Sequence, residues 1–244
     1  MRYLGGKAAI AKHVVDVIER YRAPGQPVWE PFCGGLNVTA ELARRGVFVF
    51  ASDASVPLIA LLTAVRDGWQ PPTTLTREEW YAAKMLDVTH PLHGFAMQGC
   101  SFGGRYGEGY AKPDERHTSY AAESAKALLC DVPLVCANGA IGLLDMLAVE
   151  PGPTEALLYC DPPYAGRKGY GAVGAFDRER FVERVVEWSR HTTVLVSEYD
   201  FPIGEVVWSR ERASKLRVGG ARHVERIYRV GPPLPGASEA ICRH

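Results

Sequence analysis

The tetrapeptide Asp161-Pro162-Pro163-Tyr164 places a carboxylate, two prolines and an aromatic ring directly after an apolar segment, residues 156–160. Each proline restricts its own backbone and lacks an amide proton, so the carbonyl groups here have fixed directions and are not used in a helix. The Asp161 carboxylate and the Pro162 carbonyl can accept both hydrogens of one amino group while Tyr164 stacks on the attached ring. The alternative is a rigid turn at a strand end.

Such a pair of acceptors suits a reaction at an amino group on an aromatic base. The lone pair of that nitrogen is delocalised into the ring, which makes the nitrogen a poor nucleophile. Fixed hydrogen bonds to both amino protons favour a tetrahedral nitrogen, and its lone pair can then attack a sulfonium methyl group. The tetrapeptide therefore predicts methyl transfer to an exocyclic amino nitrogen, such as that of adenine.

Two further polar segments follow predicted strands. Gly34 and Gly35 come after the strand at 27–30, and a glycine turn lets the backbone approach a ligand closely. Asp53 ends the next strand, at the place where acidic residues bind ribose hydroxyls in nucleotide-binding folds. Taken singly, an ordinary turn and a helix N-cap are the alternatives. Together, the two segments predict a ligand that contains a nucleoside.

Apolar segments of strand length and helix length alternate along the chain. The predicted strands are 27–30, 47–51, 134–137, 156–160 and 193–197, and the predicted helices are 10–18, 38–45, 56–66, 141–147 and 178–190. A terminal antiparallel pair is predicted at 206–208 and 224–230. This alternation predicts an α/β fold with a doubly wound, mostly parallel sheet. The carboxyl ends of its strands would bring the three polar segments to one crevice.

The segment 69–129 interrupts this alternation. It starts at a proline break, contains short helical stretches at 77–86 and 120–129, and has a glycine-rich, aromatic and basic middle at 100–112. Glycine at this density makes a regular helix or a central strand costly, so the middle is predicted to be a loop. We therefore expect a main domain formed by 1–68 and 130–244, with 69–129 as an inserted lobe.

In this order, the motifs resemble those of the Dam-like DNA adenine methyltransferases, the alpha-order enzymes that carry D-P-P-Y. The segment 3–7 is similar to their N-terminal aromatic-x-Gly-Gly-Lys element, and 30–35 to their cofactor loop. Asp53 resembles their ribose-binding acid, 161–164 their catalytic motif, and 196–200 their later strand-end motif. The resemblance covers nearly the whole chain, with 69–129 in the place of the target-recognition domain.

The resemblance implies a class I S-adenosylmethionine-dependent methyltransferase fold, S-adenosylmethionine as cofactor and double-stranded DNA as partner. The implied catalytic residues, around an adenine flipped out of the duplex, are Asp161, Pro162, Pro163 and Tyr164. The residues implied to surround the cofactor are Tyr3, Lys7, Glu30, Pro31, Phe32, Gly34, Asp53, Asn138, Ile141 and Asp161. The start of the sequence lacks the pattern of a secretory signal, so we expect a cytoplasmic protein, of a bacterial or phage-infected cell. We expect a monomer, with a weak dimer on DNA as the alternative.

Net charge gives no information on a DNA partner, because Lys plus Arg and Asp plus Glu both number 28. Locally, the segment 208–229 carries seven Lys and Arg residues against two Glu, which suits contact with phosphates. The residues expected to bind DNA are Arg105, Tyr106, Tyr110, Lys112 and Arg116 in the insert, with Lys215, Arg217 and Arg222 near the C-terminus. The alternatives are a flexible surface loop and a solvated hairpin.

Two positions depart from the family pattern. Leu36 stands where the common pattern has its last glycine, and Asn138-Gly139-Ala140 stands where many relatives have an acidic residue. These departures give one alternative, a nucleic-acid-binding relative without catalysis. The same chemistry gives another, an amino-methyltransferase that acts on RNA, cytosine or protein glutamine. The six scattered cysteines form no C-x-x-C pair, so no metal site is expected, and no apolar run has the length of a membrane span.

Overall fold

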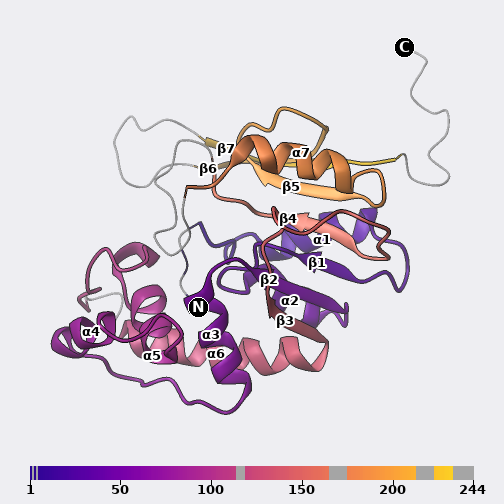
Figure 1. Cartoon of the computed structure of the whole chain (residues 1–244). Coiled ribbons are helices and arrows are strands. Elements are labelled where there is room, and N and C mark those ends of the chain that lie inside the picture. Colours follow the sequence, from indigo (N-terminus) through magenta and orange to yellow (C-terminus); the bar gives the residue numbers. More distant parts are fainter. Residues whose placement is uncertain (2, 4, 114–118, 165–174, 213–222, 233–244) are drawn as a thin grey trace.

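The strands of the chain form one mixed sheet in the order β3-β2-β1-β4-β5-β7-β6 (Figure 1). The computed structural model describes residues 1, 3, 5–113, 119–164, 175–212 and 223–232. The strands are β1 (Val28–Glu30), β2 (Val49–Asp53), β3 (Gly139–Leu143), β4 (Leu157–Cys160), β5 (Val194–Glu198), β6 (Glu205–Arg212) and β7 (His223–Val230). β1 to β5 pair in parallel, whereas β7 pairs antiparallel with both β5 and β6.

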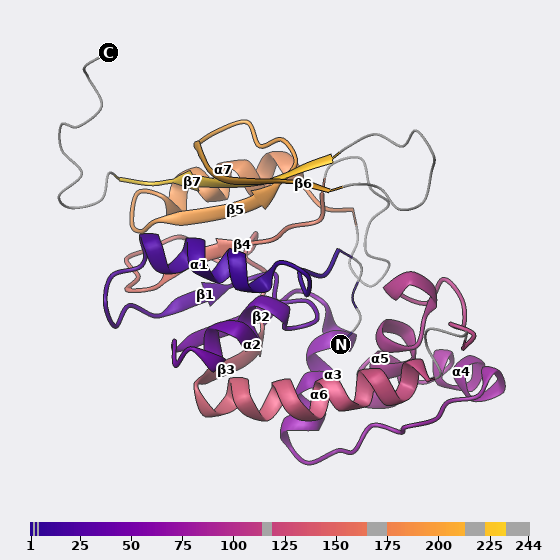
Figure 2. The ribbon, with the colours of Figure 1, turned by 180° about the vertical axis from the view of Figure 1, so that it is seen from behind.

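Helices cover both faces of this sheet. α1 (Ala11–Tyr21), α2 (Asn37–Arg44), α3 (Val56–Arg66) and α6 (Tyr120–Ala137) share one core cluster with strand residues such as Val28 and Leu195. α7 (Arg178–Trp188) packs on the other face, in a second cluster with Trp29 and Val194. α7 therefore lies in front of the sheet in Figure 1, whereas α1 and α2 lie in front of it in Figure 2. Buried residues on both faces explain the continuously apolar strands, and the predicted fold class is confirmed.

The prediction was wrong between residues 134 and 147. Residues 134–137, expected to be a strand, are the last turn of α6, and residues 141–147, expected to be a helix, contain most of β3. A short apolar run does not distinguish a buried strand from a buried helix turn. In α6 the buried side chains Leu128, Val132 and Val135 recur at helical spacing across Pro133.

The segment predicted as an inserted lobe is mostly helical. It contains α4 (Arg77–Lys84), α5 (Pro91–Gly94), η1 (Phe95–Gly99) and η2 (Phe102–Gly104). α4 begins at a capping box in which Thr76 and Glu79 bond to each other's backbone amides. α6 runs without interruption across the predicted boundary at residue 129, and buried residues such as Trp80 and Phe95 belong to the same core cluster as α1 and α2.

The order of the strands places the polar strand ends side by side. β1 and β4 are neighbours at the centre of the sheet, where the chain reverses its direction of winding, and ligands bind in the crevice at such a switch point. Glu30 ends β1, Asp53 ends β2, and Asp161 directly follows β4. No helix among the described residues has the length and apolarity that crossing a membrane requires.

We predict that Gly139→Ala strongly destabilises the protein, whereas Gly142→Ala in the same strand does not. A Cβ at Gly139 would lie 1.8 Å from the Val49 carbonyl oxygen, but a Cβ at Gly142 would meet only the Phe50 ring at 3.5 Å. The cost of the first substitution should be at least about 2 kcal/mol and the effect of the second under about 1 kcal/mol. Urea unfolding of the two variants measures both values, and equal effects would contradict the tight β2–β3 contact.

Candidate active site

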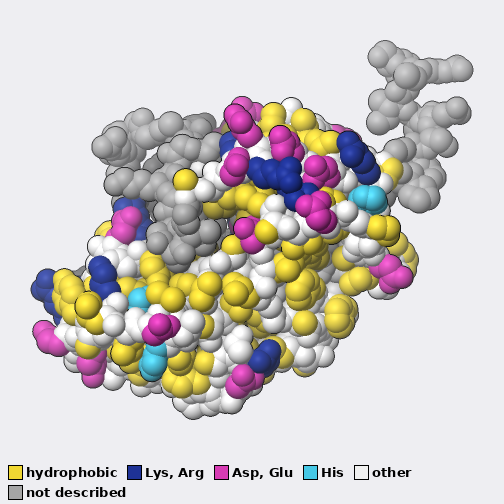
Figure 3. Space-filling model, in the orientation of Figure 1, with side chains coloured by type: hydrophobic (Ala, Val, Ile, Leu, Met, Phe, Trp, Pro, Cys, Tyr) yellow, Lys and Arg dark blue, Asp and Glu magenta, His cyan; other side chains and the backbone are white. Residues whose placement is uncertain are grey.

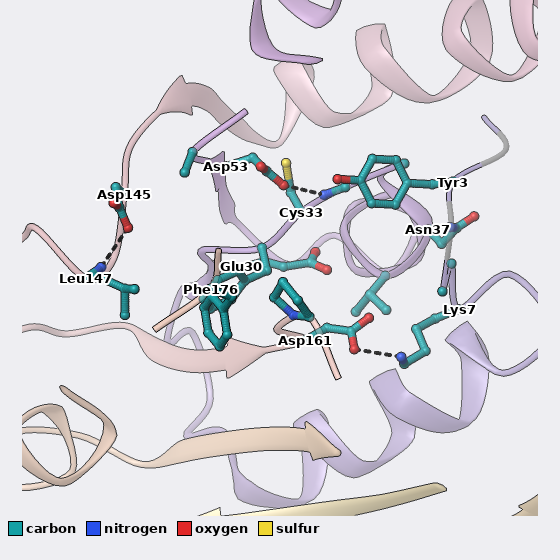
Figure 4. Close-up of a pocket in the computed structure, with 18 of the residues that line it drawn as sticks. Tyr3, Lys7, Glu30, Cys33, Asn37, Asp53, Asp145, Leu147, Asp161 and Phe176 are labelled. Atoms are coloured by element: carbon teal, nitrogen blue, oxygen red, sulfur yellow. Dashed lines mark hydrogen bonds and ion pairs between the residues drawn. The ribbon is translucent and has the colours of Figure 1, made fainter. Parts of the chain in front are cut away.

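One cavity of about 1020 Å³, a volume that includes its open mouth, lies at the carboxyl ends of the central strands. Figure 4 shows Lys7, Glu30, Asp53 and Asp161 converging on it from separate segments of the chain. Of the predicted cofactor residues, those that line the cavity are Tyr3, Lys7, Glu30, Phe32, Gly34, Asp53 and Asp161. Pro163 of the tetrapeptide lines it too. The strand order therefore assembles most of the predicted site.

The glycine loop after β1 is fastened to the end of β2. The Gly34 amide donates to Asp53 Oδ2 at 3.1 Å, and the Cys33 amide donates to the Ser52 carbonyl at 2.9 Å. The second Asp53 oxygen, Oδ1, accepts from the Ser55 amide at 2.9 Å, so this carboxylate shapes both loops at the cavity wall. Burial raises the pKa of Asp53, while these amide bonds oppose the rise.

Leu36 takes the backbone conformation that a glycine would take at this position. Its φ of 62° and ψ of 22° lie in the left-handed region, and its side chain is buried in the core. With leucine in this conformation the turn stays closed. The last amide of the turn still donates to the Cys33 carbonyl at 2.9 Å.

Tyr3 connects the N-terminal segment to this loop. An added Cβ at Gly34 would lie 3.0 Å from the Tyr3 ring, and one at Gly35 would lie 2.8 Å from the Met1 carbonyl oxygen. Gly34 also has a φ of 46°, which side chains disfavour. The two glycines are therefore needed for the N-terminal segment to pack on the loop.

Lys7 is the centre of a polar network at the edge of the cavity. Its Nζ lies 2.6 Å from Asp161 Oδ1, 2.7 Å from Tyr164 Oη and 3.1 Å from Glu225 Oε1. Burial lowers the pKa of Lys7, but the charges and hydrogen bonds of Asp161 and Glu225 outweigh this effect and raise the pKa overall. Lys7 is therefore a buried ammonium between two carboxylates.

Asp161 faces the cavity and is ion-paired at its wall rather than in the hydrophobic core. Its side chain is 17% exposed, against 4% for Lys7. Burial raises the pKa of Asp161, and the Lys7 ammonium opposes the rise. Lys7 binds Oδ1, so Oδ2 is the carboxylate oxygen that this ammonium does not bind.

The Tyr164 side chain is held at both its ring and its hydroxyl. The hydroxyl accepts from Lys7, and its single proton can go to Glu225 Oε1 or to Ser197 Oγ, each 3.2 Å away. The Tyr164 ring meets the Tyr199 ring edge-on, with centroids 4.6 Å apart. Ser197 and Tyr199 belong to the end of β5, the segment that resembles the family's later strand-end motif.

Glu30 is a buried carboxyl that titrates far from its ordinary range. Its side chain accepts a short hydrogen bond from Thr39, and its pKa is raised to about 8, first by burial and then by the nearby Asp161 charge. A cation bound in the cavity would favour the ionised form of Glu30.

Sequence reasoning missed two parts of the cavity. Asp145 follows the end of β3 and lines the cavity, so this strand end does carry an acidic residue. By contrast Asn138 caps α6 at the start of β3, and Asn138 and Ile141 are not among the lining residues. The second missed part is aromatic: Phe176 lines the cavity and meets the Phe32 ring edge-on at 5.9 Å. Correct placement of β3 would have identified Asp145, but no local signal marks Phe176.

The other predicted site residues lie around the cavity rather than in its wall. Pro31 and Pro162 are buried, and with Tyr164 they are not among the lining residues. Of the residues predicted to bind DNA, Arg105 and Lys112 are exposed, and Arg105 pairs with Glu108. Four predicted DNA-binding residues lie outside the described residues, namely Arg116, Lys215, Arg217 and Arg222.

Tyr106 and Tyr110 have structural partners within the insert. The Tyr110 hydroxyl donates to the Leu75 carbonyl at 2.8 Å. The Tyr106 hydroxyl lies 2.6 Å from His93 Nε2, while His93 Nδ1 lies 3.2 Å from the Ala83 carbonyl. Because the carbonyl can only accept, Nδ1 carries the proton and Nε2 accepts from Tyr106. Both hydroxyls therefore stabilise the glycine-rich loop.

The surface of α7 is basic but compensated by acidic residues. Figure 3 shows Lys and Arg side chains interleaved with Asp and Glu over this helix. Arg184 pairs with Glu150 and Glu187, and Arg180 pairs with Glu183. The three arginines of α7 are thus matched by three glutamates of the same helix, so this face has no excess of positive charge for binding phosphates.

Sequence comparison supports the family resemblance. Residues 3–81 match the family of D12 class N6 adenine-specific DNA methyltransferases. This match covers about a third of the chain, including Tyr3, Lys7, Glu30 and Asp53, and it ends before Asp161. The predicted resemblance to the adenine methyltransferases is confirmed over this segment. No match was found among curated proteins.

Several solved methyltransferase structures have a similar fold. SMU.472, described as a methyltransferase complexed with SAH, has 14% identity and a TM-score of 0.41; the match covers 94% of this chain and 54% of that protein, so the chain spans about half its length. The glycopeptide N-methyltransferase MtfA complexed with S-adenosyl-L-methionine has 10% identity and a TM-score of 0.37, covering 91% and 71%. Magnesium protoporphyrin IX methyltransferase from Synechocystis PCC 6803 with bound SAH has 10% identity and a TM-score of 0.39, covering 92% and 81%. At this similarity they add nothing to the functional argument.

We predict that Glu30→Gln stabilises the unliganded protein more and more as the pH rises from 5 to 8. In this window the unfolded chain has lost the Glu30 proton while the folded chain retains it, so wild-type stability falls with pH. The difference in unfolding free energy between variant and wild type should grow by at most about 1.4 kcal/mol per pH unit. Urea titrations at several pH values measure it, with the exposed Glu183→Gln as control. A difference that does not change with pH would contradict the raised pKa.

Proposed function

We propose that this chain is a site-specific DNA adenine methyltransferase that uses S-adenosylmethionine to methylate the exocyclic amino nitrogen of a flipped adenine. The observation that carries the proposal is that Asp161, the acid of the D-P-P-Y motif, shares one cavity with Glu30 and Asp53. The family match over residues 3–81 supports adenine in DNA as the substrate.

The composition of the cavity wall fits S-adenosylmethionine. Lys7 is the single Lys or Arg among the described lining residues, whereas the acidic ones are Glu30, Asp53, Asp145, Asp161 and Asp177. An excess of carboxylates suits a ligand with a sulfonium charge. We assign the ribose hydroxyls to Asp53 and an apolar part of the ligand to the aromatic wall of Phe32 and Phe176.

When bound, S-adenosylmethionine supplies a methyl group on a sulfonium sulfur. The residues of the chain prepare the nucleophile: the Asp161 oxygen not bonded to Lys7 and the Pro162 carbonyl accept the two amino protons, and the Tyr164 ring packs on the base. The cofactor would supply the methyl group to this nitrogen and would leave as a neutral thioether, with the electron pair of the broken carbon–sulfur bond. The amino nitrogen then gives up one proton, for which Asp161 is the nearby acceptor.

The DNA side of the proposal rests on the insert. An amino group paired inside a duplex cannot reach Asp161, so the adenine must leave the stack. Arg105 and Lys112 are exposed cations on the insert, and Phe102 beside them is 69% exposed. We propose these residues, with Arg116 and the basic residues Lys215, Arg217 and Arg222, as the DNA contacts.

Two observations favour catalysis over the alternative of a relative without it. Leu36 has a left-handed backbone, the conformation that suits a glycine, and β3 is followed by an acidic residue, Asp145, that lines the cavity. Methylation of RNA, cytosine or protein glutamine uses the same pair of acceptors, and the experiment below separates these substrates from adenine in DNA.

The deciding experiment incubates the protein with labelled S-adenosylmethionine and, in parallel, mixed-sequence duplex DNA, RNA and total protein. We predict label in adenine of duplex DNA and a rate at least about 100-fold lower for Asp161→Asn. The exposed Asp67→Asn, with an ordinary surface carboxylate, should retain the wild-type rate. Label confined to RNA or protein, or an active Asp161→Asn variant, would refute the proposal.

Within the insert, we predict that Arg105→Ala and Tyr106→Phe act differently. Loss of the exposed Arg105 charge should weaken DNA binding and reduce the salt dependence by about one ion. Loss of the Tyr106 hydroxyl should leave His93 without its donor and lower the unfolding free energy by about 1 kcal/mol, with little change in DNA affinity. Salt titrations of DNA binding and thermal melts measure both, and a reversed pattern would contradict the assignment.

A further inference from the structure

Glu225 is a buried carboxylate that belongs to none of the motifs discussed above. It lies on β7, the strand that pairs antiparallel with β5, and is 1% exposed. Its Oε1 lies 3.1 Å from Lys7 Nζ and 3.2 Å from Tyr164 Oη. It is not among the residues that line the cavity, so it contacts the site through these two side chains.

The position of Glu225 beside Lys7 explains how it affects the site. An ammonium has three protons, and those of Lys7 have three acceptors: Asp161, Tyr164 and Glu225. Because Glu225 and Asp161 both pair with its Nζ, Lys7 cannot change its side-chain conformation without losing a buried ion pair, which is costly. Lys7 therefore holds Asp161 Oδ1 in one orientation, which also fixes the position of Oδ2.

Other polar and titratable groups of the described residues lie around Glu225. Ser197 on β5 shares the Tyr164 hydroxyl, and Tyr159 on β4 is buried, with its pKa raised by burial and by the Asp161 charge. On the other side of β7, Arg210 of β6 lies opposite Glu225 in register, and it is exposed. Lys7 is a buried cation in direct contact with this carboxylate, at 3.1 Å.

We propose that Glu225 is a positioning residue for methyl transfer. It holds Lys7 and Tyr164 so that Asp161 presents one fixed oxygen, and Tyr164 one fixed ring plane, to the target amino group. This inference rests on the proposed function above and adds a residue from the antiparallel end of the sheet. It also assigns Glu225 to the chemical step rather than to cofactor binding.

The first test compares Glu225→Gln with Glu205→Gln, a variant of an exposed carboxylate on the neighbouring strand β6. Under single-turnover conditions with saturating cofactor and DNA, Glu225→Gln should lower the methylation rate about 10- to 100-fold, because small misplacements of reacting groups have effects of this size. The dissociation constant of the cofactor should change less than about threefold. Glu205→Gln should match wild type. A wild-type rate for Glu225→Gln, or a loss confined to cofactor affinity, would overturn the proposal.

A double-mutant cycle with Lys7→Met tests whether Glu225 acts through Lys7. If it does, Glu225→Gln should have little further effect on the rate, under about threefold, once Lys7 is gone. Equal effects in both backgrounds would overturn the proposal. Glu225→Asp, which retains the charge, should recover part of the rate, and thermal melts of all variants identify any loss caused by unfolding alone.

A measurement that does not depend on enzyme activity separates this inference from the proposed function. The Lys7 side chain, followed by NMR of its labelled ε-carbon, should titrate at lower pH in Glu225→Gln than in wild type, because one of the two charges that raise its pKa is removed. An unchanged titration would overturn the inference even in an active enzyme. Absence of methyl transfer by the wild-type protein, with the NMR shift present, would instead refute the proposed function.

Discussion

The buried ion pair between Lys7 and Asp161 is the contact on which the site depends. Its partners are 154 residues apart in sequence, and their nitrogen and oxygen lie 2.6 Å from each other. A buried ammonium is tolerated only with compensating charge, so Lys7 of the N-terminal segment must lie beside Asp161, at the end of β4. The same segment places Tyr3 against the glycine loop, which Asp53 fastens to β2. A single electrostatic requirement therefore aligns three separate parts of the chain around one cavity.

The sheet topology supplies a second carboxylate, Glu225, that balances the buried charge of Lys7. An entirely parallel sheet would end at β5, but here β7 runs antiparallel beside it and brings Glu225, two residues from Ile227, the partner of Ser197, to the Tyr164 hydroxyl. The Tyr164 hydroxyl contacts Ser197 of β5 and Glu225 of β7, so it links the parallel part of the sheet to the antiparallel part. The glycine loop and Asp53 form the opposite wall from parallel strands alone. The Asp53 side of the cavity thus depends on parallel strand pairing alone, whereas the Lys7–Asp161 ion pair also uses a carboxylate from the antiparallel strand β7.

The residues that sequence reasoning predicted well are those that follow a strand in an unusual local pattern. Asp161 and Gly34 are of this kind, since prolines or glycines beside an apolar run indicate both their position and their chemistry. Asp145 was missed because the glycines of β3 resemble a helix boundary, and only the close approach of Val49 explains why Gly139 is required in a strand. Glu225 has no local pattern at all. Its importance comes from a long-range contact, which composition and periodicity do not contain.

Leu36 shows that a position in a family pattern can require a backbone conformation rather than one residue type. A left-handed backbone costs a non-glycine residue roughly 1–2 kcal/mol, but burial of a leucine side chain contributes about 1.5–3 kcal/mol. Because Leu36 is 1% exposed among core residues, its packing offsets the strain and the loop keeps its course. The amide of Gly34 consequently stays in place for Asp53. Leu36 departs from the family pattern in residue type. Its packing in the core nevertheless stabilises the left-handed turn that a glycine would adopt more easily.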